Sequence, residues 1–109
     1  MSVSVVETLT DYLTASGDVV VHTCVSTNGE VLTVELTNET GSAVTITGLS
    51  KSTNTSQNSA GDIVAGAGKT SIADGETLKR SINMTTAFEN VVLNASGNLS
   101  VNISGIGWT

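Results

Sequence analysis

Proline is absent from this chain of 109 residues, and cysteine and aromatic residues are scarce. Without proline, the turns must rely on Gly, Asn, Asp and Ser. The single cysteine, Cys24, excludes an intramolecular disulfide and a cysteine-based metal cluster, and we expect it to be a small buried hydrophobic residue. One Phe, one Tyr and one Trp are too few for a carbohydrate-binding platform or a base-stacking face.

Basic residues are also few. The formal net charge is −6, and the cations are Lys51, Lys69, Lys79 and Arg80. They cannot form a basic patch, so nucleic acid is not expected as a partner. No apolar run is long enough to span a membrane, and the first residues lead into no secretory signal peptide. We therefore expect a protein that acts or assembles inside a cell, or one whose leader has been removed from the numbering.

The clearest pattern in the chain is a period-two alternation of apolar and polar residues from Glu30 to Ser50. Such alternation predicts half-buried strands. The apolar positions are Leu32, Val34, Leu36, Val44 and Ile46. Residues 38–42 contain Asn and Gly, which tolerate the left-handed backbone of a chain reversal, so we predict a hairpin here. Gly48 breaks the alternation and predicts a bulge or a strand end.

Other segments also read as strands. Residues 19–25 are apolar on both faces, which predicts a central strand, and the following Asn28-Gly29 pair predicts a hairpin. Further strands are predicted at 70–72, 76–84, 90–93 and 98–104. The polar segment 51–62 is predicted to be an exposed loop, either a plain connection or a mobile, binding element.

The first fifteen residues allow two interpretations. Helical spacing and a capping box at 4–7 favour a helix, whereas the β-branched content favours a strand or an extended arm, which we place slightly ahead. Such an arm can complete a neighbouring subunit's sheet, although pairing within its own sheet is favoured. We therefore divide the chain into residues 1–15, an arm or first strand, and residues 16–109, one domain.

These patterns predict an all-β protein. Seven or eight short strands, with turns every eight to twelve residues, favour an antiparallel Ig-like or Greek-key β-sandwich. A small closed barrel is the alternative.

No motif in the sequence carries chemistry. A lone histidine, His22, and scattered carboxylates predict neither a catalytic set nor a metal site, so we expect no enzyme and no cofactor. Two residues stand out as candidate contacts: Arg80 shares the phase of apolar neighbours, and Trp108 either fills the end of the core or anchors an interface. The candidate subunit contacts are Val3, Val5, Leu9, Arg80 and Trp108.

Six of the nine asparagines lie in Asn-x-Ser/Thr sequons. They are Asn38, Asn54, Asn83, Asn94, Asn98 and Asn102. The sequons are typical of a glycosylated extracellular protein, but they also arise when Asn alternates with Ser or Thr on exposed strands and turns. We favour the second interpretation and keep all six as candidate glycosylation sites.

Three segments carry a resemblance to a known family: GEVLTVELTNETGSAVTITGLS, IADGETLKRSINM and GNLSVNISG. Together they resemble the Ig-like β-sandwiches of archaeal surface filament proteins, the archaellins and pilins, and accessory β domains of virions. Those filament subunits begin with a long apolar helix, which this chain lacks. The resemblance therefore implies assembly through the β domain itself, by strand addition or face contacts.

The function expected from these observations is that of a non-enzymatic structural subunit. A virion protein, such as a capsid-decoration or tail component, fits best, and a filament (pilus-like) subunit or a cell-surface adhesion module is the alternative. The expected partners are further copies of the chain or other structural proteins of the assembly. The expected location is a virion or an extracellular surface assembly.

Overall fold

The computed structural model describes residues 2–13, 17–63, 70–85 and 87–109. Over these residues the chain forms strands and one short 3-10 helix. The elements are β1 (Val3–Tyr12), β2 (Val19–Thr23), β3 (Glu30–Thr37), β4 (Val44–Ser52), η2 (Ser59–Gly61), β5 (Thr70–Ile72), β6 (Thr77–Met84), β7 (Asn90–Ala95) and β8 (Leu99–Trp108).

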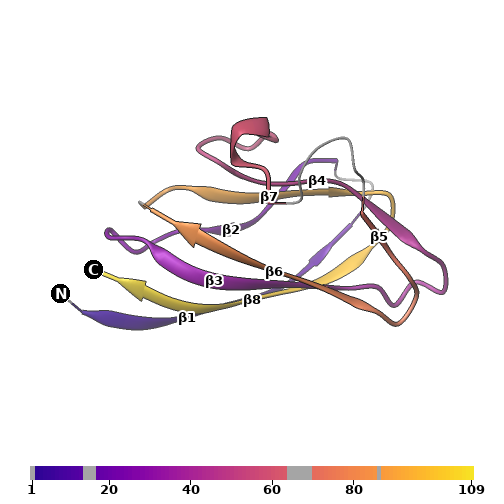
Figure 1. Ribbon diagram of the computed structural model, residues 1–109, viewed down its shortest axis with the longest axis horizontal. Helices are drawn as coiled ribbons and strands as arrows, with labels where there is room; N and C mark the ends of the chain where they lie inside the picture. Colours follow the sequence, from indigo (N-terminus) through magenta and orange to yellow (C-terminus); the bar gives the residue numbers. More distant parts are fainter. Residues whose placement is uncertain (1, 14–16, 64–69, 86) are drawn as a thin grey trace.

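The strands form two antiparallel four-stranded sheets that pack against each other (Figure 1). Sheet A has the order β1-β8-β3-β6, and sheet B has the order β2-β7-β4-β5. The first strand pairs with the last, the second with the seventh, the third with the sixth and the fourth with the fifth. One long antiparallel ribbon wrapped around a core gives this pattern, which is a jelly roll built from two Greek keys.

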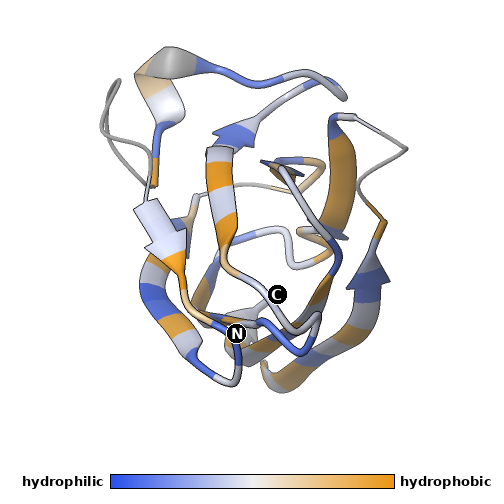
Figure 2. Cartoon of the chain, turned by 90° about the vertical axis from the view of Figure 1, so that its right-hand side faces the viewer, coloured by the Kyte–Doolittle hydropathy of each residue, from blue (hydrophilic) through white to orange (hydrophobic). Residues whose placement is uncertain are grey.

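The predicted all-β antiparallel sandwich is confirmed. Its strands follow the jelly-roll order and not the A-B-E-D and C-F-G order of immunoglobulin domains. The two sheets stay separate, so the closed barrel is not formed. The inner faces supply a core of aliphatic side chains, and Figure 2 shows the alternation of hydrophobic and hydrophilic residues along the strands. The largest buried side chain, Tyr12, ties the end of β1 to sheet B because its hydroxyl accepts the Ala95 N–H at 3.0 Å.

Both predicted hairpins are wrong. β3 belongs to sheet A, whereas β2 and β4 belong to sheet B, so the reversals around Asn28-Gly29 and at residues 38–42 join the two layers. The Asn38 side chain fixes the second crossing: its Nδ2 donates to the Ser42 and Ile72 carbonyls at 2.7 and 2.8 Å. Asn and Gly thus reverse the chain as predicted, but out of the plane of the sheet.

The predicted central position of residues 19–25 is also wrong, because β2 lies at the edge of sheet B. β2 nevertheless buries Val21 and His22, because it lies beside β1 of the opposite sheet. At this point the His22 ring forms a hydrogen bond with the Thr8 hydroxyl. The N-terminal segment is a strand, not a helix, and β1 pairs with β8 of its own chain along its whole length. Pairing within its own sheet is therefore confirmed.

The remaining strand predictions are confirmed with small changes of boundary. The strand predicted at 98–104 continues as β8 to Trp108, and that predicted at 90–93 continues as β7 to Ala95. The bulge at Gly48 is present, since the register with β7 shifts between Ile46 and Gly48.

Candidate functional site

Four exposed apolar side chains and the half-buried Trp108 gather on the outer face of sheet A. We call this set the apolar patch, and its members are Val3, Val5, Val31, Ile106 and Trp108. Val3 lies opposite Trp108 on the neighbouring strand, and Ile106 lies between Val5 and Val31. Val5 is 84% exposed and Val3 is 64% exposed. Contiguous exposed apolar surface marks interaction sites in soluble proteins, so this patch is the first candidate functional site.

The structure brings three of the five candidate contact residues together in the patch: Val3, Val5 and Trp108. Leu9 lies farther along the same face, beside a shallow depression of about 390 Å³ that Asn102 also lines. The Asn102 Oδ1 atom is buried there and accepts no hydrogen bond from a described residue. The depression lies on the same outer face of sheet A as the patch.

Arg80 lies apart from the patch, on the edge strand β6. Its Nη1 donates to the Lys79 carbonyl at 2.8 Å. The guanidinium therefore turns back over the edge, which explains how an arginine can share the phase of Leu78 and Ile82.

The outer face of sheet B is partly covered by the segment that follows β4. Alternation directs Ser50, Ser52 and Val92 away from the core, yet all three are buried. The segment that follows β4 folds back over them: Gln57 accepts the Ser50 hydroxyl at 2.6 Å and donates to the Val92 carbonyl at 3.0 Å. In Figure 1 this segment arches over β4 and β7. The polar stretch predicted as an exposed loop thus covers one sheet.

Gly48 leaves room for the Gln57 side chain. A Cβ atom at Gly48 would fall 2.6 Å from the Gln57 Cδ atom, so any side chain here would displace the end of the Gln57 side chain. The main chain adds a further tie, because the Ile63 N–H donates to the Leu49 carbonyl at 2.8 Å. Sheet A has no comparable layer among the described residues.

The six sequons occupy different environments. The Asn38 side chain is fully buried and its Nδ2 donates to two carbonyls, so a glycan there would have to displace both bonds. Asn54 and Asn94 use their side chains in surface hydrogen bonds, and Asn83 and Asn98 are exposed. Asn102 is half-buried on the outer face of sheet A. Glycosylation remains a prediction at each site.

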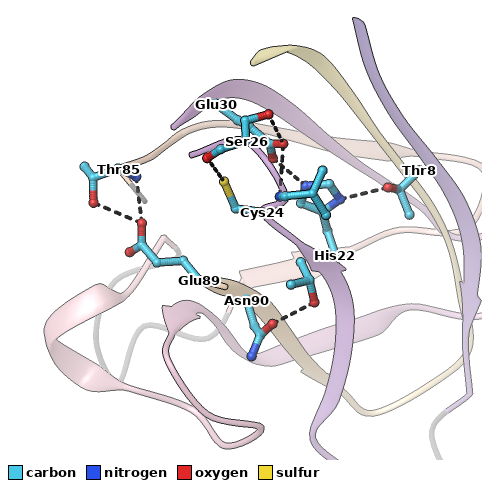
Figure 3. A network of polar contacts seen from close by, with 10 residues as sticks. Thr8, His22, Cys24, Ser26, Glu30, Thr85, Glu89 and Asn90 are labelled. Carbon is cyan, nitrogen blue, oxygen red and sulfur yellow. Dashed lines mark hydrogen bonds and ion pairs between the residues drawn. The ribbon is translucent and has the colours of Figure 1, made fainter. Parts of the chain in front are cut away.

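A second candidate lies between the sheets, where a hydroxyl, an imidazole and a carboxylate are aligned (Figure 3). Thr8 of β1 places its Oγ1 atom 2.8 Å from Nδ1 of His22 on β2. The Nε2 atom of His22 lies 2.8 Å from Oε1 of Glu30 on β3. The network joins both sheets, and it places Thr8 at a surface groove of about 340 Å³.

Glu30 is buried but fully hydrogen-bonded. Its Oε2 accepts the Ser26 hydroxyl at 2.9 Å and, at 3.4 Å, the Val25 N–H. Burial raises the pKa of the Glu30 carboxyl, but the hydrogen bonds from His22 and Ser26 outweigh it and hold the pKa below its ordinary value. Glu30 is therefore ionised at neutral pH, and His22 must donate through Nε2.

Space for this carboxylate comes from Gly107, which is paired with Glu30 across the sheet. A Cβ at Gly107 would fall 2.1 Å from the Ser26 hydroxyl oxygen. Nearby Cys24 is buried, as expected, and donates to the Ser26 carbonyl at 3.5 Å. Burial also raises the pKa of the Cys24 thiol, which keeps it protonated at neutral pH. Every polar group around Glu30 therefore has a structural partner.

Hydroxyl, imidazole and carboxylate in one line are the parts of an acyl-transfer triad. Here, however, the hydroxyl belongs to a strand residue that links β1 to β2, and the carboxylate organises the chain between β2 and β3. We interpret the network as a polar tie across the sandwich. One sequence signal could have revealed it: Glu30 shares the inward phase of Leu32, Val34 and Leu36, which requires a buried partner for its charge.

The described residues contain no group of three or more His, Cys, Asp or Glu side chains arranged to hold a metal ion. They also contain no helix long and apolar enough to cross a membrane. Comparisons with protein-family models, with curated proteins and with solved structures found no match. The case for function therefore rests on the surfaces described above.

Proposed function

We propose that this protein is a non-enzymatic structural subunit of a larger assembly. A virion structural protein, such as a capsid-decoration or tail component, is the form we favour. The observation that carries the proposal is the apolar patch on the outer face of sheet A, which stays bare while the chain covers sheet B with its own residues 53–62. Burying such a patch against another protein removes apolar area from water and favours association.

The jelly-roll topology supports the virion form by analogy, because viral capsid domains commonly adopt it. The fold also occurs in lectins and other proteins, so topology gives a preference among assemblies and no more. A filament subunit is the alternative, supported by the unpaired edges of sheet A. The adhesion-module alternative receives less support. Its binding site would be the segment 51–62, in which Gln57 and Asn58 already form hydrogen bonds with sheet B.

The test removes the apolar character of the patch without changing its shape. Val5→Thr and Val31→Thr, combined in one chain, keep β-branched side chains on β1 and β3. We expect this variant to stay monomeric at concentrations at which the wild-type chain associates, as measured by size-exclusion chromatography with light scattering. Leu13→Thr is the matched control, because it removes an exposed apolar side chain outside the patch.

The control should associate like the wild-type chain. If the Val5→Thr/Val31→Thr variant associates as strongly as the Leu13→Thr control, the patch is not the contact surface. Electron microscopy of the associated wild-type protein then distinguishes closed particles from filaments.

A further inference from the structure

The two unpaired edges of sheet A carry opposite charges. The β1 edge contains Glu7 and Asp11 and no basic residue, whereas the β6 edge contains Lys79 and Arg80 and no acidic residue. Glu7, Asp11 and Lys79 are exposed, and Arg80 is partly exposed. Within the described part of the chain, none of the four takes part in an ion pair. Half of the four cations of the whole sequence thus lie on a single edge strand.

No described strand pairs with the outer edge of β1, so backbone hydrogen-bonding groups there lack a strand partner. Ser2 and Thr109 exchange both backbone hydrogen bonds, at 2.9 and 3.0 Å, which fixes the even-numbered residues of β1 as those that bond to β8. The odd-numbered residues direct their N–H and C=O groups to the free side. These residues are Val3, Val5, Glu7, Leu9 and Asp11.

The main chain of β6 is arranged in the same way. The Asn38 N–H donates to the Glu76 carbonyl at 3.0 Å, which fixes the even-numbered residues of β6 as those that bond to β3. The backbone groups that point to the outer side of this edge therefore belong to Thr77, Lys79, Ser81 and Asn83.

The directions of the strands allow the two edges to join. Neighbours in sheet A are antiparallel throughout, so β1 and β6, three places apart, run in opposite directions. A second copy placed beside the first in the same orientation therefore sets its β1 antiparallel to β6. The sheet continues without a change of pattern, as in recognition by strand addition.

We propose that β1 of one molecule pairs with β6 of a second copy of this chain, so that sheet A continues from copy to copy. The pairing that opposes Glu7 to Lys79 also opposes Val3 to Asn83 and Leu9 to Thr77. Each pair matches outward-pointing backbone groups on both strands. The contact joins two different surfaces, so it builds a ring or an open filament. This inference rests on the proposed function, because it names a second copy as the partner and adds an edge contact to that of the apolar patch.

Charge selects this arrangement over the symmetric one. Two β1 edges paired with each other would oppose strands that carry two carboxylates each and no cation. Like charges across strands are destabilising, whereas opposite charges stabilise by about 0.2–1 kcal/mol per pair. The copies must also overcome a net charge of −6 each, which makes the one basic edge the favoured acceptor.

Two exposed contacts must yield when the edges join. Arg80 donates to the Lys79 carbonyl, and the Lys51 Nζ atom donates to the Asn83 carbonyl at 2.6 Å. Both carbonyls point to the outer side of β6, so in the isolated molecule these cations occupy hydrogen-bond acceptors of the edge. The incoming N–H groups of β1 replace them, which leaves the carbonyls satisfied and the cations free for solvent or for the carboxylates of β1.

Charge exchange on the full chain tests the contact. Glu7→Lys and Lys79→Glu each place like charges across the contact, and each should raise the concentration needed for association about tenfold. The double variant Glu7→Lys/Lys79→Glu should restore association. Glu39→Lys is the matched control, because it makes the same charge change at an exposed turn residue that belongs to neither β1 nor β6. Light scattering measures association, and circular dichroism verifies folding.

A mixture of the two single variants gives the sharpest result. In an equimolar mixture, the substituted β1 edge of one variant opposes the substituted β6 edge of the other, and the native edges oppose each other, so association should return. Wild-type association that no edge variant changes would overturn this inference and leave the proposed function standing. The same holds if only Glu7→Lys has an effect, which indicates β1–β1 pairing, or if the double variant and the mixture fail to associate. A wild-type chain that is monomeric at every concentration would overturn both.

Discussion

The two sheets bury their inner faces alike but treat their outer faces differently. On sheet B, the segment around Gln57 covers Ser50, Ser52 and Val92, and its polar groups bond to the strands below. On sheet A, the apolar patch stays exposed. A chain that covers one sheet with its own backbone and leaves the other bare has a surface available for a partner. The difference separates residues that stabilise the monomer from residues that we expect to serve assembly.

The largest effect is expected where the two sheets are tied together. His22→Ala removes the donor that faces Glu30 and leaves a buried carboxylate without its main partner. Loss of one member of a buried pair costs about 3 kcal/mol of unfolding free energy or more. Urea unfolding at pH 7 measures it.

The control for this experiment is Thr8→Ala, which removes only the hydroxyl at the half-exposed end of the network. We expect it to cost about 1 kcal/mol. A His22→Ala variant no less stable than Thr8→Ala would show that the network does not hold the sheets together.

A smaller effect is expected on the covered face. Gln57→Ala removes the acceptor for the Ser50 hydroxyl and the donor to the Val92 carbonyl, at a cost of about 2 kcal/mol. Because the cover serves the monomer, association should not change. Thr55→Ala, in the same segment, is the control. If Gln57→Ala alters association but not stability, the distinction between the two faces is reversed.

A smaller effect again concerns pH. The lowered pKa of Glu30 means that its stabilising contribution is fully present above the ordinary carboxyl pKa, about 4.3, and is lost as the pH falls through the lower folded-state pKa. The Glu30→Gln variant has no carboxylate at this position, so its stability does not include this pH-dependent contribution. The difference in unfolding free energy between the wild type and Glu30→Gln should therefore be constant near neutrality and should shrink below about pH 4.3. A difference that grows on acidification would contradict the assigned direction.

Sequence reasoning predicted the strands well because alternation is local. Residues 70–72, 76–84 and 98–104 lie in strands as expected, and Gly48 forms its bulge. Pairing is not local. The reversal at Asn38 follows from turn chemistry, but the same Asn and Gly serve a hairpin or a crossing between layers, so the sequence could not tell that β3 and β4 lie in different sheets.

The candidate site shows the same limit. Val3, Val5 and Trp108 were identifiable as candidate contact residues at the two ends of the chain, but only the pairing of β8 with both β1 and β3 brings them together with Val31. The tie between His22 and Glu30 was missed because the inward phase of Glu30 indicates a buried charge but does not identify His22 as its partner. Their contact depends on two sheets meeting at that point.

The central claim is that the bare face and edges of sheet A exist for contact with other molecules. The most direct test is the molar mass of the wild-type chain by light scattering over a wide range of concentrations, followed by electron microscopy. We expect a mass that rises above that of a single chain as concentration increases, with regular particles or filaments in the images. A single-chain mass at every concentration, with no particles, filaments or virion association, would contradict it.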